Sequence, residues 1–420
     1  MRPSRTDPAP GPALRRNRDF VLLQAGQLLS NAGTQTSTIA YPLLTLAVTH
    51  SAAAAGVVGF ARALPPALLA LPAGLAADRW NRKRLMVLAD VVRALAVATL
   101  AAGVLFGAVA IWTIAVVALV EGCGACLFSA AAAGALRAVV PTAQLPAAVA
   151  VGTGRQAAVQ LVGPPLGGVL FAAARALPFV VDAVSYAFST LSLLAMRTPF
   201  QEHREPDPSP LRRQLAEGFR FLWGQPFLRT CALLFGLGNF IGPGLLLTLV
   251  VVGRQQGLSA AAVGGLVAAF AAALLVGSAA SPWVRRWLPV RAVLVLELWM
   301  WLGCGLFLIS PSVFVLAAGM LPSALAIPSS DSIVHGYRIA MTPDRLLGRS
   351  EAVRSTISLL IAPLGPLVAG LLLTSTSARG TVAFFAVATG VLALWGTLSP
   401  ALRHAPHLAQ LAEATTRARG

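Results

Sequence analysis

A short charged loop at residues 74–84 separates two apolar runs of the chain. The loop reads Gly-Leu-Ala-Ala-Asp-Arg-Trp-Asn-Arg-Lys-Arg, and each flanking run has about twenty residues with almost no charge, enough to cross a bilayer as a helix. A loop this short makes the two helices antiparallel neighbours, and its cations are retained on the cytoplasmic side of the membrane. The sequence therefore predicts a polytopic membrane protein whose orientation is fixed by this loop.

The composition supports a membrane protein and excludes most soluble classes. Apolar residues make up 57% of the chain and charged residues only 11%, whereas soluble domains carry roughly 25% charged residues. The net charge of +17 is spread over the breaks between apolar runs, whereas a nucleic-acid-binding protein gathers its cations on one folded face. We therefore expect the lipid bilayer as a partner, with the cations acting as topology signals, and no nucleic acid.

The four cysteines all lie inside apolar runs. Cys123 and Cys126 have the C-x-x-C spacing that a metal or redox site can use. No second pair and no histidine ligand accompanies them in the sequence, so we interpret them as small residues on a packed membrane helix. The sequence also contains no G-x-x-x-x-G-K-[ST] nucleotide-binding signature and no catalytic cluster. We expect neither an enzyme nor a metal or other cofactor.

The apolar runs predict about twelve transmembrane helices. An even number places both termini on the same side of the membrane. The loops on the predicted outer side hold only Arg175, Arg254 and Arg379, as the positive-inside rule requires. The expected spans are residues 20–46, 53–77, 85–106, 109–133, 147–172, 176–196, 229–252, 262–283, 290–309, 312–330, 352–374 and 381–400.

A polar segment at residues 197–228 divides the spans into two halves. Pro206 and Pro208 keep its first part extended, and Ser209 followed by Pro210 is a helix start signal. The helix that follows is amphipathic and is expected to lie along the inner membrane surface. Its apolar face consists of Leu211, Leu215, Phe219, Leu222 and Trp223.

The two halves are internal repeats. A constant shift along the sequence superimposes Gly163-Pro164 on Gly365-Pro366, and Gly168 on Gly370. Parallel six-helix repeats are a transporter architecture in which the solute site lies between the halves near the membrane midplane. The predicted fold is an all-α polytopic membrane protein with two parallel six-helix repeats. The expected segments are an N-terminal tail (1–19), an N-terminal bundle (20–196), the linker (197–228), a C-terminal bundle (229–400) and a C-terminal tail (401–420).

Three motifs resemble those of a known family. The loop at residues 74–84 resembles the G-x-x-x-D-R-x-G-R-K signature of the major facilitator superfamily, with Asn81, which also tolerates a left-handed backbone, in place of the second glycine. Residues 163–168, Gly-Pro-Pro-Leu-Gly-Gly, resemble the G-P-x-x-G-G antiporter motif of the fifth span. Residues 343–349 are similar to the bacterial macrolide-efflux and enterobactin-exporter-like branch. The resemblance implies the major facilitator fold and transport by alternating access.

The resemblance also implies that the charged loop is a conformational latch. Asp78 is expected at the amino end of a helix in the other half, by resemblance the eleventh span, where the helix dipole favours an anion. Such contacts exist only when the cytoplasmic side is closed, so they favour the outward-facing state. The alternative is a charged turn that only sets topology. The residues assigned to the latch are Gly74, Asp78, Arg79, Arg82 and Lys83.

Glycines and prolines of the fifth and eleventh spans are expected to let helices pack closely and bend. A bent, closely packed pair can rock without opening a proton leak, and the alternative is ordinary packing of small residues. The motif residues are Gly163, Pro164, Gly167 and Gly168 in the fifth span and Gly365, Pro366 and Gly370 in the eleventh.

Ionisable residues inside the spans are costly to bury and mark functional sites. Glu121 lies near the middle of the fourth span, and Arg155 and Arg62 are also embedded. We predict that Glu121 and either arginine face a shared polar cavity, and that Glu121 is the best candidate for proton coupling. The alternative is a structural ion pair. Asp182 and Glu297 are expected to be peripheral, by resemblance to the family.

Uncharged polar residues complete the predicted cavity. Relatives in the family often carry an acid in the first span, where this chain has Thr34 and Gln35. Four residues are expected to offer hydrogen bonds in the cavity, and helix–helix contacts explain each about as well. They are Asn31, Gln35, Tyr41 and Asn239. Asp331 is expected to join a cytoplasmic charge network.

The function expected from these residues and the resemblance is secondary transport of a small molecule in a bacterial cytoplasmic membrane. We expect proton-coupled efflux of a bulky, mostly apolar solute, such as a drug, an antibiotic or a siderophore-like compound, by a functional monomer with both termini cytoplasmic. An importer of a nutrient or metabolite on the same fold, and a membrane sensor or scaffold without transport, are the alternatives.

Overall fold

The computed structural model describes residues 14–198, 200, 211–343 and 346–403, and the regular structure of these residues is helical. The N-terminal half contains η1 Leu14–Arg16, α1 Arg18–Thr49, α2 Ala52–Arg79, α3 Arg82–Leu105, α4 Ile111–Val139, η2 Thr142–Gln144, α5 Leu145–Ala173 and α6 Leu177–Ala195. After α7 Leu211–Gly224, the C-terminal half contains α8 Pro226–Gln255, α9 Ala260–Trp287, α10 Val290–Met300, η3 Trp301–Gly305, α11 Leu306–Ile309, α12 Val313–Met341, α13 Leu347–Ile361, α14 Leu364–Ser375, α15 Ala378–Leu398 and α16 Pro400–Arg403.

Eleven helical segments of the described chain are long and apolar enough to cross a membrane. The twelfth expected span is α1, which is 32 residues long but carries polar side chains such as Gln24, Gln27 and Asn31. Several polar side chains of α1, including Ser30 and Ser37, are buried against neighbouring helices rather than facing lipid. The prediction of an all-helical membrane protein with about twelve spans is confirmed.

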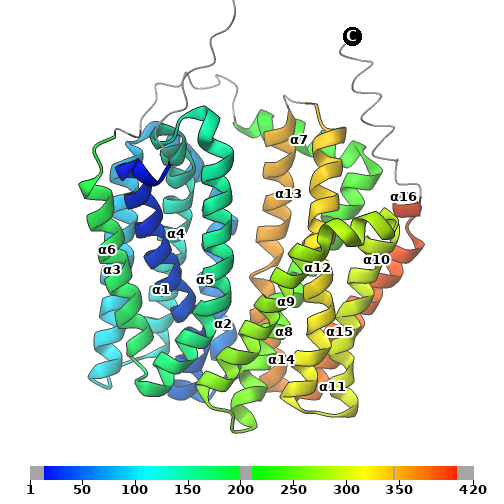
Figure 1. The fold of residues 1–420 in the computed structure, drawn as a ribbon. Helices are drawn as coiled ribbons and strands as arrows, with labels where there is room; N and C mark the ends of the chain where they lie inside the picture. Colours follow the sequence, from blue (N-terminus) through cyan, green and yellow to red (C-terminus); the bar gives the residue numbers. More distant parts are fainter. Residues whose placement is uncertain (1–13, 199, 201–210, 344–345, 404–420) are drawn as a thin grey trace, which may run out of the picture.

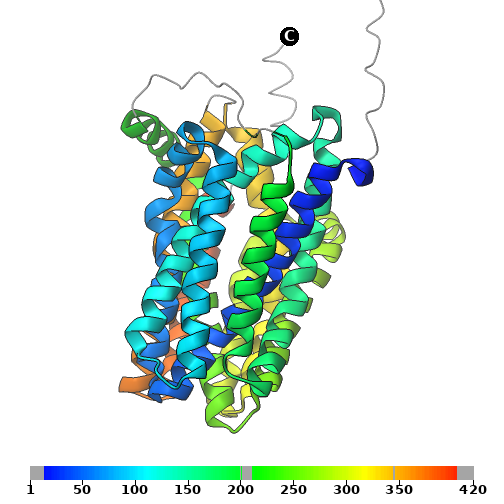
Figure 2. The same ribbon diagram turned by 90° about the vertical axis from the view of Figure 1, so that its left-hand side faces the viewer.

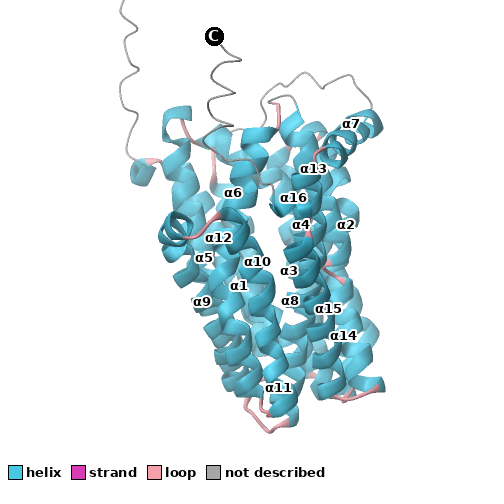
Figure 3. Ribbon diagram, turned by 90° about the vertical axis from the view of Figure 1, so that its right-hand side faces the viewer, coloured by secondary structure: helices cyan, strands magenta, loops and turns pink. Residues whose placement is uncertain are grey.

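The helices form two bundles that stand side by side (Figure 1), and the turned view of Figure 2 has the N-terminal bundle in front. The view in Figure 3 confirms that both bundles are built from helices joined by short turns. We call the end of the molecule that holds η1, α7 and α16 the upper end, and the end that holds the α1–α2 and α8–α9 turns the lower end. The two bundles repeat one topology. The contacts between them reflect this, because α5 packs against α9 while α14 packs against α2.

Two predicted spans of the C-terminal half are interrupted helices. The span at residues 290–309 passes through the 3₁₀ turn η3, where Gly303 meets the backbone of Gly319 in α12. The eleventh span breaks between α13 and α14 at Pro363. Proline has no backbone N–H to donate and its ring clashes with the preceding turn, so Pro363 and Pro366 cannot continue the α13 hydrogen bonds.

The linker helix α7 lies across the upper end of the C-terminal half (Figure 1). Its Glu217 forms an ion pair with Arg349 of α13, and Gly218 lies against the Arg349 backbone. Leu222 is buried, while Phe219 and Trp223 stack on each other with ring centroids 4.7 Å apart. The predicted start of this helix at Ser209 and Pro210 lies outside the described residues.

Close backbone packing joins the two halves near the lower end. A Cβ added at Gly168 of α5 would collide with the Ala260 carbonyl of α9, and one at Gly370 of α14 would lie 2.5 Å from the Ala52 carbonyl of α2. The reciprocal glycines behave alike, since a Cβ at Gly56 or Gly264 would lie 2.6 Å from a proline carbonyl of the opposite half. Only glycine permits these approaches, and small residues of this kind are how membrane helices pack tightly.

Gly163, Gly167 and Gly365 use the same property inside each half. Gly163 and Gly167 face Gln35 and Thr36 of α1, and Gly365 faces the Phe240 backbone of α8. The two glycine–proline motifs therefore each contact one helix of their own half and one helix of the other. The motif positions that the sequence relates by its repeat have equivalent surroundings in the fold.

The glycine contacts predict that a larger side chain at the lower end will separate the two halves there. Gly168→Val should push α5 away from α9, because overpacking of a filled contact costs typically about 1–3 kcal/mol, a roughly five- to hundredfold shift in an equilibrium between closed and open forms. In a chain whose four native cysteines are replaced, we expect faster labelling of Ala55→Cys, a buried position next to the Gly56 contact between α2 and α14. The reagent is an impermeant maleimide supplied on the lower-end side.

Gly154→Val in the same helix is the matched control, because a Cβ at Gly154 meets nothing within 4 Å. It should leave the labelling rate unchanged. Equal labelling of the Gly168→Val and Gly154→Val proteins would contradict a lower-end closure that depends on glycine.

Candidate functional site

A cavity of about 380 Å³ lies between the two halves, above the lower-end glycine contacts. We call it the central cavity. Helices of both halves line it, and most of the lining is apolar. Its volume falls in the range of small-molecule sites, roughly 300–1,000 Å³. The polar side chains in its wall are Thr34, Thr38, Tyr41, Arg62 and Glu121.

A buried ion pair forms the polar part of the central cavity. Arg62 of α2 donates to Glu121 of α4 at 2.9 Å, with 21% of the arginine side chain and 2% of the glutamate side chain exposed. Arg62 also donates to Thr38 at 2.8 Å and lies 5.4 Å from the centre of the Tyr41 ring. A pair of this kind persists in a membrane because each charge would be very costly alone.

A second guanidinium reaches the same carboxylate through a tyrosine. Arg93 of α3 donates to the Tyr186 hydroxyl at 2.6 Å and lies 4.0 Å from the centre of its ring. Tyr186 donates in turn to Glu121 at 3.3 Å. Arg93 also pairs with Asp90 at 3.4 Å. The four helices α2, α3, α4 and α6 are therefore joined through one charged network.

The structure separates the two arginines that the sequence offered as partners of Glu121. Arg62 contacts it, whereas Arg155 of α5 donates to Gln24 of α1 at 2.5 Å, away from the central cavity. Residue depth along a helix predicts height in the membrane but not the direction in which a side chain points. Arg155 and Glu121 have similar depth and face different neighbours.

Of the uncharged residues proposed for the cavity, Tyr41 lines it and the others do not. Asn31 donates to Gln156 of α5 at 3.3 Å, and Gln35 accepts from Thr38 at 3.3 Å while its Cβ faces Gly163. Asn239 donates to the Phe235 carbonyl one turn earlier in α8 and lines two other cavities.

Asp182 is not peripheral, which corrects the expectation from the sequence. It is fully buried between α6 and α1, where it accepts from Ser37 at 2.6 Å. Gly33 of α1 makes room for it, because a Cβ there would lie 2.7 Å from an Asp182 oxygen. The glycine and serine spaced four apart on α1 are the signal that could have indicated a buried polar neighbour.

Glu297 also departs from the expectation. Glu297 of α10 is 6% exposed, so it lies in the interior of the C-terminal half and not at its periphery. Asp331 of α12 lines two cavities of that half and shares the larger one with His335, Arg338 and Arg354, so its place in a charge network near the upper end stays a prediction.

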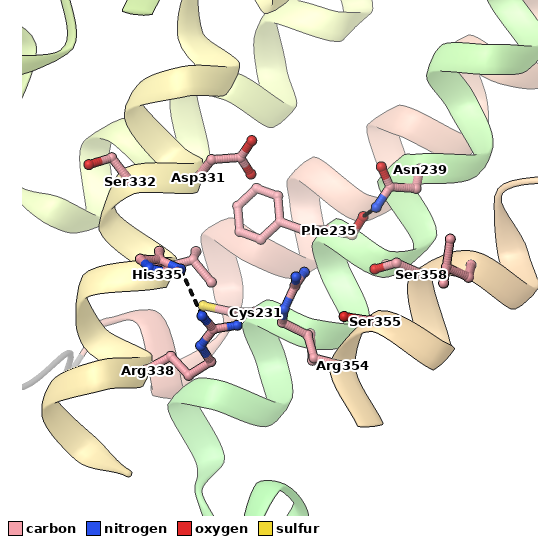
Figure 4. A pocket seen from close by; sticks show the side chains of 14 residues that line it. Cys231, Phe235, Asn239, Asp331, Ser332, His335, Arg338, Arg354, Ser355 and Ser358 are labelled. Carbon is pink, nitrogen blue, oxygen red and sulfur yellow. Dashed lines mark hydrogen bonds between the residues drawn. The ribbon is translucent and has the colours of Figure 1, made fainter. Parts of the chain in front are cut away.

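The larger of these cavities, which we call the upper cavity, has a volume of about 680 Å³ and is lined by α8, α12 and α13. Figure 4 shows Asp331 pointing toward Phe235, with Arg338 and Arg354 farther along the same space. Both arginines pair with Glu351, and Arg338 also contacts the His335 ring at 2.7 Å. The smaller cavity, which we call the side chamber, has a volume of about 320 Å³.

The charged loop contacts its own half in this structure. Lys83 donates to the carbonyls of Met196 and Leu194 at 2.6 and 3.3 Å, and Arg82 donates to that of Ala77 at 3.1 Å. Cations suit the carboxyl end of a helix because its last carbonyls lack partners. Asp78 is 64% exposed and its ion pair is with Arg82, so the predicted contact with the other half is not made in this state.

Three further positions in the loop differ from what the signature suggested. Asn81 has φ −63° and accepts from the Arg84 N–H at 3.1 Å, so it is the N-cap of α3 and not a left-handed residue. A Cβ at Gly74 would meet nothing within 4 Å, so no close approach requires this glycine here. Arg79 is exposed at the end of α2.

Comparison with known proteins places this geometry in a family. Residues 24–298 match the model of the Major Facilitator Superfamily. The multidrug efflux pump Tap of Mycolicibacterium fortuitum is 26% identical over 417 residues, covering 91% of this chain and 96% of the pump. The Tap pump of Mycobacterium tuberculosis is 28% identical over 424 residues, covering 92% and 94%.

Solved structures have the same fold at low identity. A bacterial homologue of the lysosomal transporter Spinster, in an inward-facing and unoccupied conformation, has a TM-score of 0.70 and 15% identity, covering 92% of this chain and 96% of that chain. A D-xylose–proton symporter has a TM-score of 0.68 and 14% identity, covering 93% and 99%. The chain is a multi-pass membrane protein that belongs to the Major Facilitator Superfamily.

Proposed function

We propose that this protein is a proton-coupled efflux transporter for bulky, mostly apolar small molecules in a bacterial cytoplasmic membrane. The observation that carries the proposal is the central cavity between the two halves, which is mostly apolar and holds one buried ion pair. Such a cavity can take a large apolar solute and contains a titratable group in contact with it. The mycobacterial relatives are multidrug efflux pumps, which favours export, and the resemblance of residues 343–349 to the macrolide-efflux branch agrees with it.

We infer that the upper end faces the cytoplasm. The cations of the charged loop lie there, together with Arg285 and Arg286 at the end of α9 and Arg403 in α16. The positive-inside rule favours this orientation, and it leaves both termini on the cytoplasmic side. Because glycine contacts close the lower end, we infer that the cavities of the described state are reached from the cytoplasm.

Glu121 is the proposed coupling residue. In this state two positive groups, Arg62 directly and Arg93 through Tyr186, hold Glu121 in its ionised form. Protonation from the outer side in the alternate state would cancel the attraction to Arg62 and free the guanidinium. Loss of that proton to the cytoplasm restores the ion pair. The cycle moves protons inward, which is the direction that can drive efflux.

The charged loop completes the proposed cycle as a latch. Asp78 is exposed here because the halves are apart at the cytoplasmic end, and it becomes available to the amino end of a helix in the other half, α13 in this fold, when that end closes. The glycines of α5 and α14 seal the other end in the opposite phase. The two closures would alternate as the halves rock about the central cavity.

Efflux is tested in a bacterium that lacks its major pumps. Cells that express the protein should accumulate several-fold less of an apolar fluorescent dye than cells with the empty vector, because the protein moves the dye outward. An uncoupler should abolish the difference. Dye fluorescence in the cells is the measurement. Higher accumulation on expression would establish import instead, and no change at normal abundance would favour a sensor or scaffold.

Glu121→Gln tests the coupling residue. Glutamine keeps a hydrogen-bonding group near Tyr186 but carries no titratable proton, so concentrative efflux driven by an imposed pH gradient in proteoliposomes should fall to background. Downhill exchange of solute should continue. Arg155→Gln is the matched control, because Arg155 is another embedded charge and its partner is a neutral glutamine. It should retain coupled transport.

A double variant distinguishes a loss of protein stability from a loss of proton coupling. Removing one partner of a buried pair costs about 3–5 kcal/mol because a charge is left uncompensated. Arg62→Gln together with Glu121→Gln should therefore recover the abundance that Glu121→Gln loses, without recovering coupling. Unchanged proton-dependent efflux in Glu121→Gln protein of normal abundance would exclude the coupling role.

A further inference from the structure

The side chamber lies within the C-terminal half and communicates with both other cavities. It shares Pro243 and Leu246 of α8 with the central cavity. It shares Phe235, Asn239 and Asp331 with the upper cavity. The side chamber therefore adjoins both the upper cavity and the central cavity. The proposed proton coupling through Glu121 does not use the side chamber.

The side chamber contains two acids and no basic residue in its lining. Glu297 lies on α10 and Asp331 on α12, and the remaining polar members are Asn239 and Thr389. This is unusual in a chain with a net charge of +17. The nearest arginines of α12 and α13, Arg338 and Arg354, belong to the upper cavity and are both paired with Glu351.

Glu297 lacks the partners that a buried carboxylate needs. Only 6% of Glu297 is exposed, and its Oε2 atom has no hydrogen-bond partner among the described residues. The hydroxyl of Thr389 is likewise buried and unpartnered within the described chain. Glu121 also has one unpartnered oxygen, but it differs from Glu297 in having the Arg62 guanidinium beside it. An unpaired polar group in a membrane interior is costly, so a bound group that satisfied it would be strongly favoured.

The rest of the wall suits a large apolar body with a positive charge. Phe270 and Trp301 face each other with ring centroids 6.2 Å apart, and Phe235 lines the same space. Aromatic faces attract cations, most strongly where water is excluded. Met320 adds a flexible, polarisable side chain that adapts to ligands of different shape. A neutral solute would leave Glu297 unpaired, and an anion would be repelled by both carboxylates.

We propose that the side chamber binds the charged group of a lipophilic organic cation, with Glu297 as its buried counter-ion and Asp331 as the acid at its mouth. Figure 4 shows Asp331 pointing toward Phe235 of α8, in the direction that the two cavities share. The apolar remainder of the ligand extends past Leu246 into the central cavity. This inference rests on the proposed efflux function, since it names the chemical class of the cargo.

Binding of two ions of nearly equal shape and opposite charge tests the proposal. Tetraphenylphosphonium and tetraphenylborate are titrated into the purified full chain in detergent, and heat or retained radiolabel is measured. Wild-type protein should bind the cation and not the anion. Glu297→Gln and Asp331→Asn should each weaken binding of the cation at least about tenfold, or about 1.4 kcal/mol. Binding of the neutral triphenylphosphine oxide should change little.

Two further variants keep the test decisive. Glu297→Asp restores the charge on a shorter side chain and should recover part of the affinity. Glu217→Gln removes one negative charge from α7, outside the chamber, and should leave binding unchanged. Asp331 is exposed to the cavities, so Asp331→Asn is expected to fold even where Glu297→Gln does not.

The outcomes that overturn the proposal are specific. Wild-type protein that binds neither ion, or both equally, excludes a cation site. Equal loss of the cation and the neutral compound in Glu297→Gln assigns Glu297 to structure or to proton transfer. The measurement needs no gradient and no transport, so it stands apart from the efflux assay. Efflux of neutral dyes with no cation selectivity leaves the proposed function intact and removes only this inference.

Discussion

The backbone contacts at the lower end determine where everything else in this protein lies. Lipid is as apolar as the helices, so hydrophobicity does not hold the two halves together, and close van der Waals packing does so instead. Gly168 and Gly264 bring α5 against α9, and Gly56 and Gly370 bring α2 against α14. These contacts join the two halves below the central cavity. The reciprocal pairing follows directly from the sequence repeat, because each half supplies the same two elements to the other.

On this common scaffold the glutamates Glu121 and Glu297 have different surroundings. Glu121 in the N-terminal half is paired with Arg62 and reached by Arg93 through Tyr186. The C-terminal half leaves Glu297 without an ion pair among the described residues. An isolated charge in an apolar medium is far more costly than a paired one, which is the physical reason for our proposal that a bound cation completes the surroundings of Glu297.

The sequence predicts the helices well because the apolar runs are long and the bilayer sets their length. It predicts Arg62 and Glu121 as embedded charges for the same reason. The sequence could not show that Arg62, and not Arg155, pairs with Glu121. The depth of a residue in the membrane follows from residue counts, whereas the direction of its side chain depends on how the helices are rotated in the bundle. Asp182 and Glu297 were misplaced because a lone acid in an apolar run says nothing about its partner.

Local chemistry in the sequence carried more information than the family signature at some positions. Asn81 follows Trp80 directly before a helix, where asparagine is a common N-cap, and the structure uses it in that way. The signature suggested a glycine-like backbone at this position instead. Pro363 and Pro366 similarly mark the break between α13 and α14. Motif resemblance predicts which residues matter to a family, whereas caps and breaks follow from the requirements of each backbone group.

The Arg62–Glu121 pair and the side chamber are separate but adjoining sites, so a proton at one and a cation at the other are expected to disfavour each other. The two sites adjoin through Pro243 and Leu246 of α8. A cation bound in the chamber places a positive charge beside the cavity that contains Glu121, where low polarity strengthens electrostatic interactions. That charge opposes a proton on Glu121, and by linkage a proton on Glu121 opposes the cation equally. With the two proposed sites, cargo and proton would occupy the protein alternately, as exchange in opposite directions requires, without direct contact between Glu121 and the cargo.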